Sequence, residues 1–339
     1  MSAGEQKKRD VSIKDIADMA SVSVATVSRV INQNGRYSVE TEARVRRIMK
    51  EYDYKPNLVA RGLRMKKVDT IGVIIPDITN EFFSKIALEL QMGLFKQGFA
   101  AMICNTNEDG FIENQYIQML NAQQVSGVIY ISGNYDEKRE QLNIPTVYID
   151  RRPKDKQTKS KTVIIESNNM QGGYLATRCL CDSNAKRIAC ISLDSRVSTH
   201  EERVNGCKKA LKEVGLFFTE QDFVTVQKNT MTEGYQALQR LLLNDQEIDG
   251  IFCTSDILAA GALKYLEEAE IEIPSQMRLV GYDDTTLSQS TKLPITTIRQ
   301  PIAEMGKLAV ENILAMVSHE KIEKKEYILP VVLVKRCTT

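Results

Sequence analysis

Polar and aromatic side chains follow the ends of several predicted strands, in combinations suited to holding a sugar. Asn80-Glu81-Phe82-Phe83 comes after the first apolar run, and Asp150-Arg151 ends the fourth. A sugar offers hydroxyl groups, which planar polar side chains can hydrogen-bond, and a C–H surface that packs on aromatic rings. Each of these side chains alone could equally be a helix cap or part of the surface. Further polar residues at comparable places are Arg203, Ser255, Asp283 and Gln300.

Alternating strands and helices are expected to position these side chains from residue 70 onward. Unbroken apolar strands separated by helices are typical of parallel sheets that are covered on both faces. A lysine-rich stretch, residues 154–161, interrupts the series, and the strand–helix alternation restarts after it. We therefore predict an α/β fold with two similar doubly wound lobes, in which ligands bind outside the carboxyl ends of the strands. The strand-length apolar runs are residues 70–75, 99–104, 125–132, 145–150, 187–193, 222–226, 249–255 and 278–284, and helical periodicity is clear at 81–98 and 202–215.

The first 55 residues have a different pattern, with short helical segments and no strand-like run. Helices are predicted at residues 13–20, within 22–35 and at 39–52, with Ser12 and Ser38 as N-caps of the first and third. Ser23 can cap the second helix, with Thr26 three residues further on. A tight turn around residues 21–23 would place seven apolar residues on one stripe: Ile16, Ala17, Ala20, Val22, Val27, Val30 and Ile31.

The outward face of the second helix has the composition needed by a helix that lies in the major groove of DNA. Small residues at its start, Val24 and Ala25, allow a close approach to base edges, and Arg29 and Asn32 can reach guanine or adenine. Hydroxyl groups such as that of Ser28 can bond phosphates. Residues 1–67 carry 15 Lys and Arg against 8 Asp and Glu, whereas the rest of the chain carries 30 against 36. This basic N-terminal part indicates a polyanionic partner.

Several classes of protein are excluded by what the sequence lacks. No apolar run reaches the roughly 18 residues of a membrane span, and the polar residues 1–10 do not form a signal peptide. The turn after the first strand, residues 76–80, contains no glycine, which argues against an NAD-dependent enzyme. The two histidines, His200 and His319, lie far apart and without a nucleophile elbow. The seven scattered cysteines are typical of a reduced, cytoplasmic protein. We predict no enzymatic activity, no metal and no cofactor.

The order of these motifs resembles the LacI/GalR (lactose-repressor) family of bacterial transcription factors, with features of its ribose repressors. The similarity covers residues 11–336 and is carried by IKDIADMASVSVATVSRVIN, RVRRIMKEYDYKPNLVARGLR, IGVIIPDITNEFF, GYDD and TTIRQP. It implies that Val24, Ala25 and Arg29 read bases in double-stranded operator DNA. It also implies phosphate contacts or capping for Ser12, Ser23, Thr26, Ser28 and Asn32. Ser21 departs from the pattern, because the family commonly has Gly at this turn position, where a positive φ is wanted and Ser costs about 1 kcal/mol.

We predict three domains from these patterns together. Residues 1–56 form the helix-turn-helix domain, residues 57–67 a hinge helix or linker, and residues 68–339 an effector-binding and dimerisation body. The predicted N-lobe spans about 68–167 and 300–328, and the C-lobe about 168–299 and 329–339. A hinge helix of about two turns is too short to be stable alone. By the family pattern, Leu63 wedges between base steps in the minor groove, with Arg61 beside it.

The resemblance also assigns the effector residues. Asn80, Phe82, Phe83, Asp150, Arg151, Arg203, Asp283 and Gln300 match the pocket of ribose-type repressors and of periplasmic ribose-binding proteins. Ser255 stands where that pattern has Asn, which weakens or replaces one hydroxyl contact. FKQGFAAMICN and EYILPV are similar to sucrose/fructose-type repressors, so D-ribose is preferred while sucrose, fructose or another sugar remains the alternative. A transport-type sugar-binding protein would share the body but lack residues 1–67.

The expected assembly is a homodimer on a palindromic site, because a helix-turn-helix reads one half-site. The sequence ends in KRCTT without a heptad repeat, so no tetramerisation helix is expected. Some relatives pair with a phosphocarrier co-regulator, which is a further candidate partner. No membrane partner is predicted.

Overall fold

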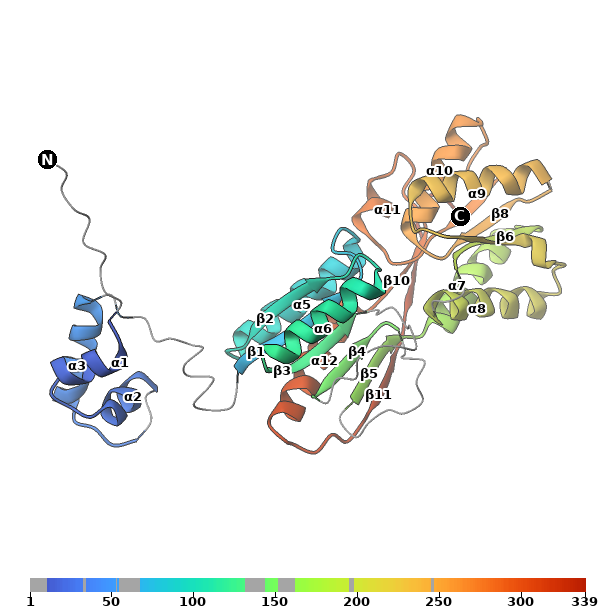
Figure 1. Cartoon of the computed structure of the whole chain (residues 1–339). Helices are drawn as coiled ribbons and strands as arrows, with labels where there is room; N and C mark the ends of the chain where they lie inside the picture. The colour runs from blue at the N-terminus through green and yellow to red at the C-terminus, as the bar shows by residue number, and fades with distance from the viewer. Residues whose placement is uncertain are drawn as a thin grey trace, which may run out of the picture. The chain divides into compact units, whose positions relative to one another are not determined.

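The computed structural model describes residues 11–32, 35–52, 54, 68–131, 144–151, 162–194, 198–244 and 247–339. The chain divides near residue 68 into two compact units, the head and the body, and each is considered by itself (Figure 1). The predicted hinge helix, with Arg61 and Leu63, and the lysine-rich stretch 154–161 lie outside the described residues. The side chain of Asn32 also lies outside them, although its backbone belongs to a helix.

The head consists of three helices, as the periodicity predicted: α1 (Ile13–Met19), α2 (Val24–Asn32) and α3 (Val39–Glu51). Ser12 and Ser38 cap α1 and α3, because their side chains accept hydrogen bonds from the backbone N–H groups of Asp15 and Thr41. One apolar cluster holds the three helices together. Its buried members are Ile16, Ala17, Ala20, Val27, Val30, Val45 and Ile48, with Val22 and Ile31 half-buried against them.

The turn between α1 and α2 has the positive φ that the sequence analysis expected at Ser21, with a value of 50°. The N–H groups of Ser21 and Val22 donate to the carbonyls of Asp18 and Ala17, at 3.1 and 3.0 Å. The chain therefore reverses within a few residues and brings Val27 onto the core formed by α1. Ser tolerates this backbone conformation at a cost that Gly would not incur.

The N-lobe of the body is a six-stranded sheet in the order β11-β5-β4-β3-β1-β2. Its strands are β1 (Val68–Ile75), β2 (Ala100–Asn105), β3 (Val125–Ile131), β4 (Thr146–Ile149), β5 (Thr162–Ser167) and β11 (Glu326–Leu329). The pairs β1–β2, β3–β4, β4–β5 and β5–β11 are all parallel. One face packs against α5 (Glu81–Lys96) and α12 (Ile302–Val317), and the other against α6 (Gly110–Ala122).

The C-lobe is a four-stranded parallel sheet in the order β7-β6-β8-β9. Its strands are β6 (Ile188–Leu193), β7 (Phe223–Val226), β8 (Gly250–Cys253) and β9 (Arg278–Val280). The helices α9 (Met231–Asn244) and α10 (Asp256–Glu268) cover one face, and α7 (Asn169–Asp182) and α8 (Ser198–Val214) the other (Figure 1). The predicted α/β architecture of two doubly wound lobes is therefore confirmed.

Pairs of glycines allow the C-lobe helices to pack with their backbones in close approach. A Cβ atom on Gly173 of α7 would lie 1.9 Å from the carbonyl oxygen of Arg203, and one on Gly206 of α8 would lie 2.1 Å from that of Met170. A Cβ on Gly261 of α10 would lie 1.9 Å from the carbonyl oxygen of Met231. These crossings fix α8 on α7 and α10 on α9, and hence the side chains at the N-terminal ends of α8 and α10.

The chain passes between the lobes at three places: between β5 and α7, between β10 (Thr297–Arg299) and α12, and between β11 and β12 (Val332–Val334). β10 and β12 form a two-stranded antiparallel sheet. The sequence analysis named no strand at β5, β10, β11 or β12. β10 and β12 are three residues long and β11 four, but length alone does not explain this, because the equally short β4, β7, β8 and β9 were marked by apolar runs, whereas β5, with six residues, was missed.

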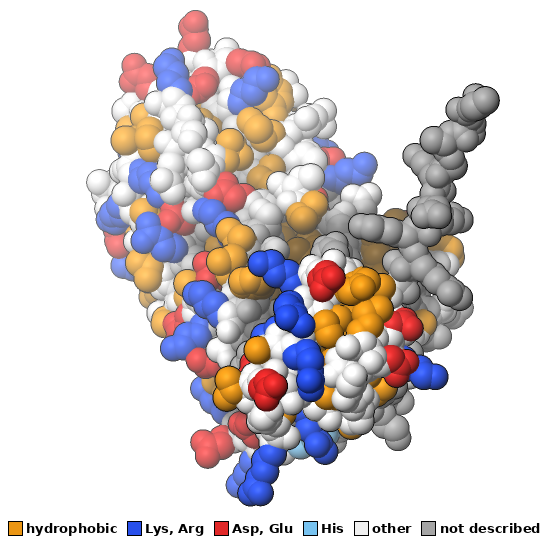
Figure 2. Space-filling view, turned by 90° about the vertical axis from the view of Figure 1, so that its left-hand side faces the viewer, with side chains coloured by type: hydrophobic (Ala, Val, Ile, Leu, Met, Phe, Trp, Pro, Cys, Tyr) orange, Lys and Arg blue, Asp and Glu red, His pale blue; other side chains and the backbone are white. Residues whose placement is uncertain are grey.

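The surface mixes charged and apolar side chains. Figure 2 shows Lys and Arg interspersed with Asp and Glu and with hydrophobic groups on the face drawn there. Much of the basic excess of residues 1–67 falls in residues 53–67, which hold five Lys and Arg against one Asp. Among the described helices, none is long and apolar enough to cross a membrane.

Candidate functional site

The outer face of α2 is the first candidate site. Ser23 accepts a hydrogen bond from the N–H of Thr26 at 3.1 Å and thereby caps the helix, as predicted. Ala25 and Arg29 are exposed, and Val24 and Ser28 are half-buried. The helix therefore presents small side chains at its start and one guanidinium group a turn later, which is the arrangement that base reading requires.

Gly35, which follows α2 in the chain, lies next to the side chain of Arg29. A Cβ atom at Gly35 would lie 3.1 Å from Cδ of Arg29, and the backbone there has a φ of +91°. The stem of the arginine thus runs closely over the glycine. Gly35 is therefore the surface on which this side chain lies.

The second candidate site is a cavity of about 350 Å³ in the body. It has two walls, which we define by the lobe that contributes the residues. The N-lobe wall consists of Asp77, Asn80, Phe82, Phe83, Asn107, Glu108, Asp150 and Arg151. The C-lobe wall consists of Leu193, Thr199, His200, Arg203, Lys228, Asn229, Thr230, Ser255 and Asp283. All the lining residues lie at or beyond the carboxyl ends of strands, as the topology of parallel sheets requires.

The start of α5 positions three residues of the N-lobe wall. Asn80 caps this helix by accepting a hydrogen bond from the N–H of Phe82 at 3.0 Å. The rings of Phe82 and Phe83 meet edge to face, with centroids 5.4 Å apart, and both are buried in the N-lobe core. The motif therefore places one amide group and an aromatic surface beside each other.

Asp150 and Arg151 follow β4 and are both buried. Asp150 has a φ of 71°, in the left-handed region that few non-glycine residues adopt. Arg151 is 7% exposed, its Nη2 lies 3.7 Å from Oε1 of Glu108, and its Nε has no hydrogen-bond partner among the described residues. Strained backbone and an unsatisfied buried donor are features that ligand-binding sites often carry.

Arg203 is held on the opposite wall by several contacts. Its Nε donates to Oδ1 of Asn169 at 2.8 Å, and its Nη1 donates to the carbonyl of Thr254 at 2.8 Å. Its guanidinium group stacks over the ring of Tyr282, 3.7 Å from the centroid. This arginine therefore enters the site already oriented, with Nη1 3.7 Å from Oδ1 of Asp283.

Asp283 lies between Arg203 and Gln300. Burial raises the pKa of Asp283 to about 8, although Arg203 and a hydrogen bond from Gln300 oppose the shift. Nε2 of Gln300 donates to Oδ1 of Asp283 at 2.7 Å, and Gln300 itself does not line the cavity. The structure therefore places Gln300 behind Asp283, where it orients the carboxyl group.

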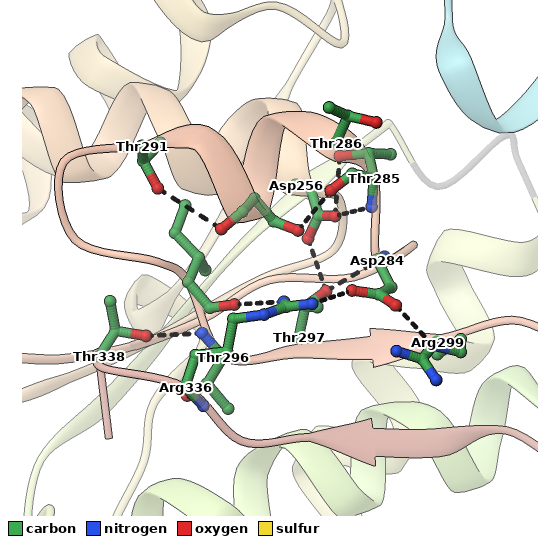
Figure 3. A network of polar contacts seen from close by, with 12 residues as sticks. Asp256, Asp284, Thr285, Thr286, Thr291, Thr296, Thr297, Arg299, Arg336 and Thr338 are labelled. Atoms are coloured by element: carbon green, nitrogen blue, oxygen red, sulfur yellow. Dashed lines mark hydrogen bonds and ion pairs between the residues drawn. The ribbon is translucent and has the colours of Figure 1, made fainter.

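A polar network anchors the turn that carries Asp283 (Figure 3). Asp256 accepts hydrogen bonds from the N–H of Thr285 at 2.7 Å and from the hydroxyl of Thr297 at 2.6 Å. The neighbouring Asp284 accepts from Arg299 and Arg336. Because Asp283 has a φ of 112°, this anchoring stabilises a backbone conformation that the turn alone would not favour.

Two residues that were not predicted as effector residues from the sequence, His200 and Asn229, are part of the C-lobe wall. His200 is 6% exposed, and its pKa is well below the ordinary value because of burial and of the nearby Arg203 and Arg151. The hydroxyl of Ser255 donates to Oδ1 of Asn229 at 2.6 Å and accepts from the N–H of Leu258. The rule that ligands bind at strand ends could have found both residues, because each follows a strand by a few positions.

The cavity brings together eight of the nine effector residues predicted from the sequence, all except Gln300. Ser255 reaches the cavity mainly as the cap of α10, and its hydroxyl is occupied by Asn229 and Leu258. Glu81, between Asn80 and Phe82, instead joins the lobes: its carboxylate accepts from the N–H and hydroxyl of Thr286, at 2.8 and 2.7 Å.

Comparison with family models gives matches to both units of the chain. Residues 12–57 match the model described as bacterial regulatory proteins, lacI family. Residues 68–337 match the model described as periplasmic binding proteins and sugar binding domain of LacI family. The two matches leave only the segment around residues 58–67 between them.

Similar proteins extend over almost the whole chain. A ribose operon repressor of Halalkalibacterium halodurans is 34% identical over 96% of this chain and 96% of its own length. A sucrose operon repressor of Pediococcus pentosaceus is 32% identical over 96% of this chain and 98% of its own length. Among solved structures, the Lac repressor dimer bound to operator and the anti-inducer ONPF superposes with a TM-score of 0.84 at 26% identity, over 98% of this chain and 99% of that one.

Proposed function

Because the chain belongs to the LacI family of bacterial regulatory proteins, we propose that it represses transcription by binding operator DNA, with an affinity that a sugar in the body controls. The observation that carries this proposal is the pairing, in one chain, of a capped helix with a small, arginine-bearing outer face and a polar cavity of about 350 Å³. The similar proteins are transcriptional regulators and not enzymes.

We assign the DNA contacts to the head and to the segment after it. Val24, Ala25 and Arg29 read base edges in the major groove, and Arg61 and Leu63 enter the minor groove. The residues proposed as phosphate contacts or caps are Ser12, Ser23, Thr26, Ser28 and Asn32, and Ser12 and Ser23 cap their helices. Since residues 53–67 carry a net charge of +4, this segment adds to the electrostatic attraction.

The domain division follows from these roles: residues 1–56 bind DNA, residues 57–67 form the hinge, and residues 68–339 bind the effector and dimerise. Two copies read the two halves of a palindromic operator. A homodimer is favoured by the similarity to the Lac repressor dimer. A phosphocarrier co-regulator remains a proposed further partner.

The effector that the pocket supports best is a small neutral sugar, with D-ribose as the first candidate. The aromatic surface of Phe82 and Phe83 suits its C–H face, and Asn80, Asp150, Arg151, Arg203 and Asp283 offer groups for its hydroxyls. The similarity to a ribose operon repressor supports ribose, and the similarity to a sucrose operon repressor supports the alternative of sucrose or fructose. Asn229 stands beside Ser255 with its carbonyl oxygen occupied, which leaves its amide N–H groups for a hydroxyl that an Asn at residue 255 would otherwise bind.

Ligand control is proposed to act through the angle between the lobes. Both walls must contact the same sugar, so binding favours one lobe arrangement over the other. Glu81 joins the lobes at the edge of the pocket, immediately next to Asn80. A change in lobe angle would move the start of β1, from which the hinge leads to the head, and would alter hinge folding on DNA.

Selection from a pool of random-sequence duplexes tests the DNA function without a known operator. Enrichment of a palindromic sequence is expected, and the affinity for it should fall steeply with salt. Arg29→Ala should reduce discrimination at one base position by about 1–3 kcal/mol, whereas Arg46→Ala, on the exposed face of α3, serves as the matched control. Recovery of no preferred sequence would contradict the proposal.

A thermal-shift screen tests the effector. The panel is D-ribose, D-xylose, D-fructose, D-glucose, cellobiose and sucrose, each added to the full chain and then to its complex with the selected duplex. One sugar should raise the melting temperature and change the DNA affinity. A shift with another sugar but not with ribose removes the ribose assignment, and no shift with any of them contradicts the effector proposal.

A further inference from the structure

His200 is a buried imidazole in the effector cavity that the family pattern does not account for. It lies on α8, three residues before Arg203, so both side chains leave the same face of the helix and reach the C-lobe wall together. Its side chain is 6% exposed. A histidine buried near two arginines requires an explanation, because a buried polar ring needs hydrogen-bond partners and a buried positive charge would be repelled by the arginines.

Its protonation follows from the surrounding charges. Burial lowers the pKa of His200 well below its ordinary value, and Arg203 and Arg151 lower it further. The ring is therefore neutral near pH 7, with one nitrogen that donates and one that accepts. The nitrogen that carries the hydrogen can only donate to a ligand, and the other nitrogen can only accept.

A chain of hydroxyl groups fixes that hydrogen on Nδ1. The hydroxyl of Ser192 donates to the backbone carbonyl of Leu193 at 3.1 Å, and a carbonyl can only accept. The hydroxyl of Thr254 then donates to the oxygen of Ser192 at 3.4 Å, which uses its single hydrogen. Nδ1 of His200 lies 2.8 Å from the oxygen of Thr254, and with the Thr254 hydrogen directed at Ser192 it is the donor of this bond.

The other ring nitrogen, Nε2, therefore carries a lone pair. His200 lines the cavity, and the described residues provide no hydrogen bond to Nε2. We propose that His200 determines effector specificity by presenting Nε2 as a fixed hydrogen-bond acceptor to one hydroxyl group of the sugar. This inference rests on the proposed effector function of the same cavity and adds a residue that the ribose pattern does not contain.

The proposed acceptor on His200 differs from the neighbouring groups, which are hydrogen-bond donors. Arg203 and the amide N–H groups of Asn229 on the C-lobe wall, and Arg151 on the N-lobe wall, are all hydrogen-bond donors. A neutral imidazole acceptor among them selects a hydroxyl that can donate to it while accepting from the adjacent guanidinium. A sugar that lacks this hydroxyl would leave Nε2 desolvated and unpaired, which is unfavourable.

The tautomer can be measured in the sugar-free protein. Two-bond ¹H–¹⁵N correlation spectra of histidine-labelled full chain at pH 7 report which ring nitrogen is protonated, and the chain has only two histidines. His319→Asn assigns the remaining signals to His200 and serves as the control, because His319 is exposed. A neutral ring protonated at Nδ1 is expected. A ring protonated at Nε2, or at both nitrogens, would overturn the proposal.

Two substitutions then separate the two edges of the ring. Asn at residue 200 keeps a donor near the position of Nδ1 and can retain the bond to Thr254, whereas Gln reaches the position of Nε2. His200→Asn should weaken binding of the sugar that gives the largest thermal shift by roughly tenfold or more, while His200→Gln should recover most of the affinity. Equal affinity in His200→Asn and the unmodified protein would contradict the proposal.

Deoxy analogues of the same sugar complete the test. One of them should bind more weakly to the unmodified protein but as well as the parent sugar to His200→Asn, since the two changes remove the same hydrogen bond. Fully additive losses for every analogue count against the proposal. If no sugar in the panel binds the unmodified protein, the proposed effector function fails, whereas the tautomer measurement still decides the state of His200.

Discussion

The N-lobe and C-lobe walls of the cavity each contain a buried arginine, but they hold it differently. Arg203 makes two hydrogen bonds of 2.8 Å, stacks on Tyr282 and lies on a helix fixed by a glycine contact. Arg151 follows a strand end, has its Nη2 3.7 Å from Oε1 of Glu108, and has an Nε that no described residue hydrogen-bonds. Hydrogen bonds within the protein therefore hold the arginine of the C-lobe wall, whereas the arginine of the N-lobe wall has a donor that the described residues do not satisfy.

This difference indicates that the two walls contribute differently to ligand binding. A side chain whose hydrogen bonds are already made loses little freedom on binding, so it contributes a fixed geometry. A side chain with an unsatisfied buried donor gains a bond when the ligand arrives, so it contributes binding energy. We expect substitutions in the C-lobe wall to reduce stability and binding together, and those in the N-lobe wall to reduce mainly binding.

The largest expected difference in stability is between the variants that remove the two arginines. Arg203→Leu should lower the free energy of unfolding of the body by about 2–6 kcal/mol, because the buried acceptors on Asn169 and Thr254 each lose a hydrogen bond, at about 1–3 kcal/mol apiece. Arg151→Leu should change it by less than about 1 kcal/mol, while both variants lose sugar binding. Urea unfolding and calorimetric titration measure the two quantities, and equal destabilisation by both variants would remove the distinction between the walls.

A smaller effect is expected from the contact that positions Arg203. Gly173→Ala places a Cβ atom where only 1.9 Å separates it from the carbonyl of Arg203, so α7 and α8 must move apart. The unfolding free energy should fall by about 1–3 kcal/mol, as in other overpacked sites. Gln171→Ala, on the exposed side of the same helix, is the control. If Gly173→Ala left sugar affinity unchanged, the helix contact would not set the C-lobe wall.

The pH dependence of stability tests the raised pKa of Asp283 in the C-lobe wall. Burial raises the pKa of Asp283 from 3.8 to about 8, so between these values the folded protein holds a proton that the unfolded chain has lost. The stabilisation is complete at low pH and is lost as the pH rises through 8, with a slope of at most about 1.4 kcal/mol per pH unit. Asp283→Asn should therefore lose less stability between pH 6 and pH 9 than the unmodified protein does. Parallel pH profiles in urea unfolding would contradict this expectation.

The smallest effect is expected at the contact that joins the lobes. Thr286→Val removes the hydroxyl that donates to Glu81 at 2.7 Å but keeps the backbone donor. Because Thr286 is exposed, the unfolding free energy should fall by only about 0.5–1 kcal/mol. Thr291→Val, in the same lobe, serves as the control. A loss of sugar affinity larger than the loss of stability would show that this contact favours the sugar-binding lobe arrangement, and no change in affinity would exclude that role.

The sequence alone determined the architecture and much of the candidate sites. Helical periodicity around Val27 and Val30 identified the helix α2, and the buried strands identified the two lobes. Motifs that are continuous in sequence, such as Asn80 to Phe83, carry their own geometry, because the strand end and the helix cap are local. Those residues could therefore be assigned to the pocket before the structure was known, although their roles in binding remain predictions.

Only the tertiary structure decided which side chains share a wall and which hydrogen bonds are already made. His200 and Thr254 are 54 positions apart, and the tautomer that we assign to the ring follows from the hydrogen bond between them. Gln300 lies behind Asp283 and not in the cavity lining, and Ser255 is a helix cap whose hydroxyl donates to Asn229. Periodicity reports which face of an element is buried, but hydrogen bonds between distant loops depend on how the sheets and helices pack. The acceptor that we assign to His200 arises from that packing.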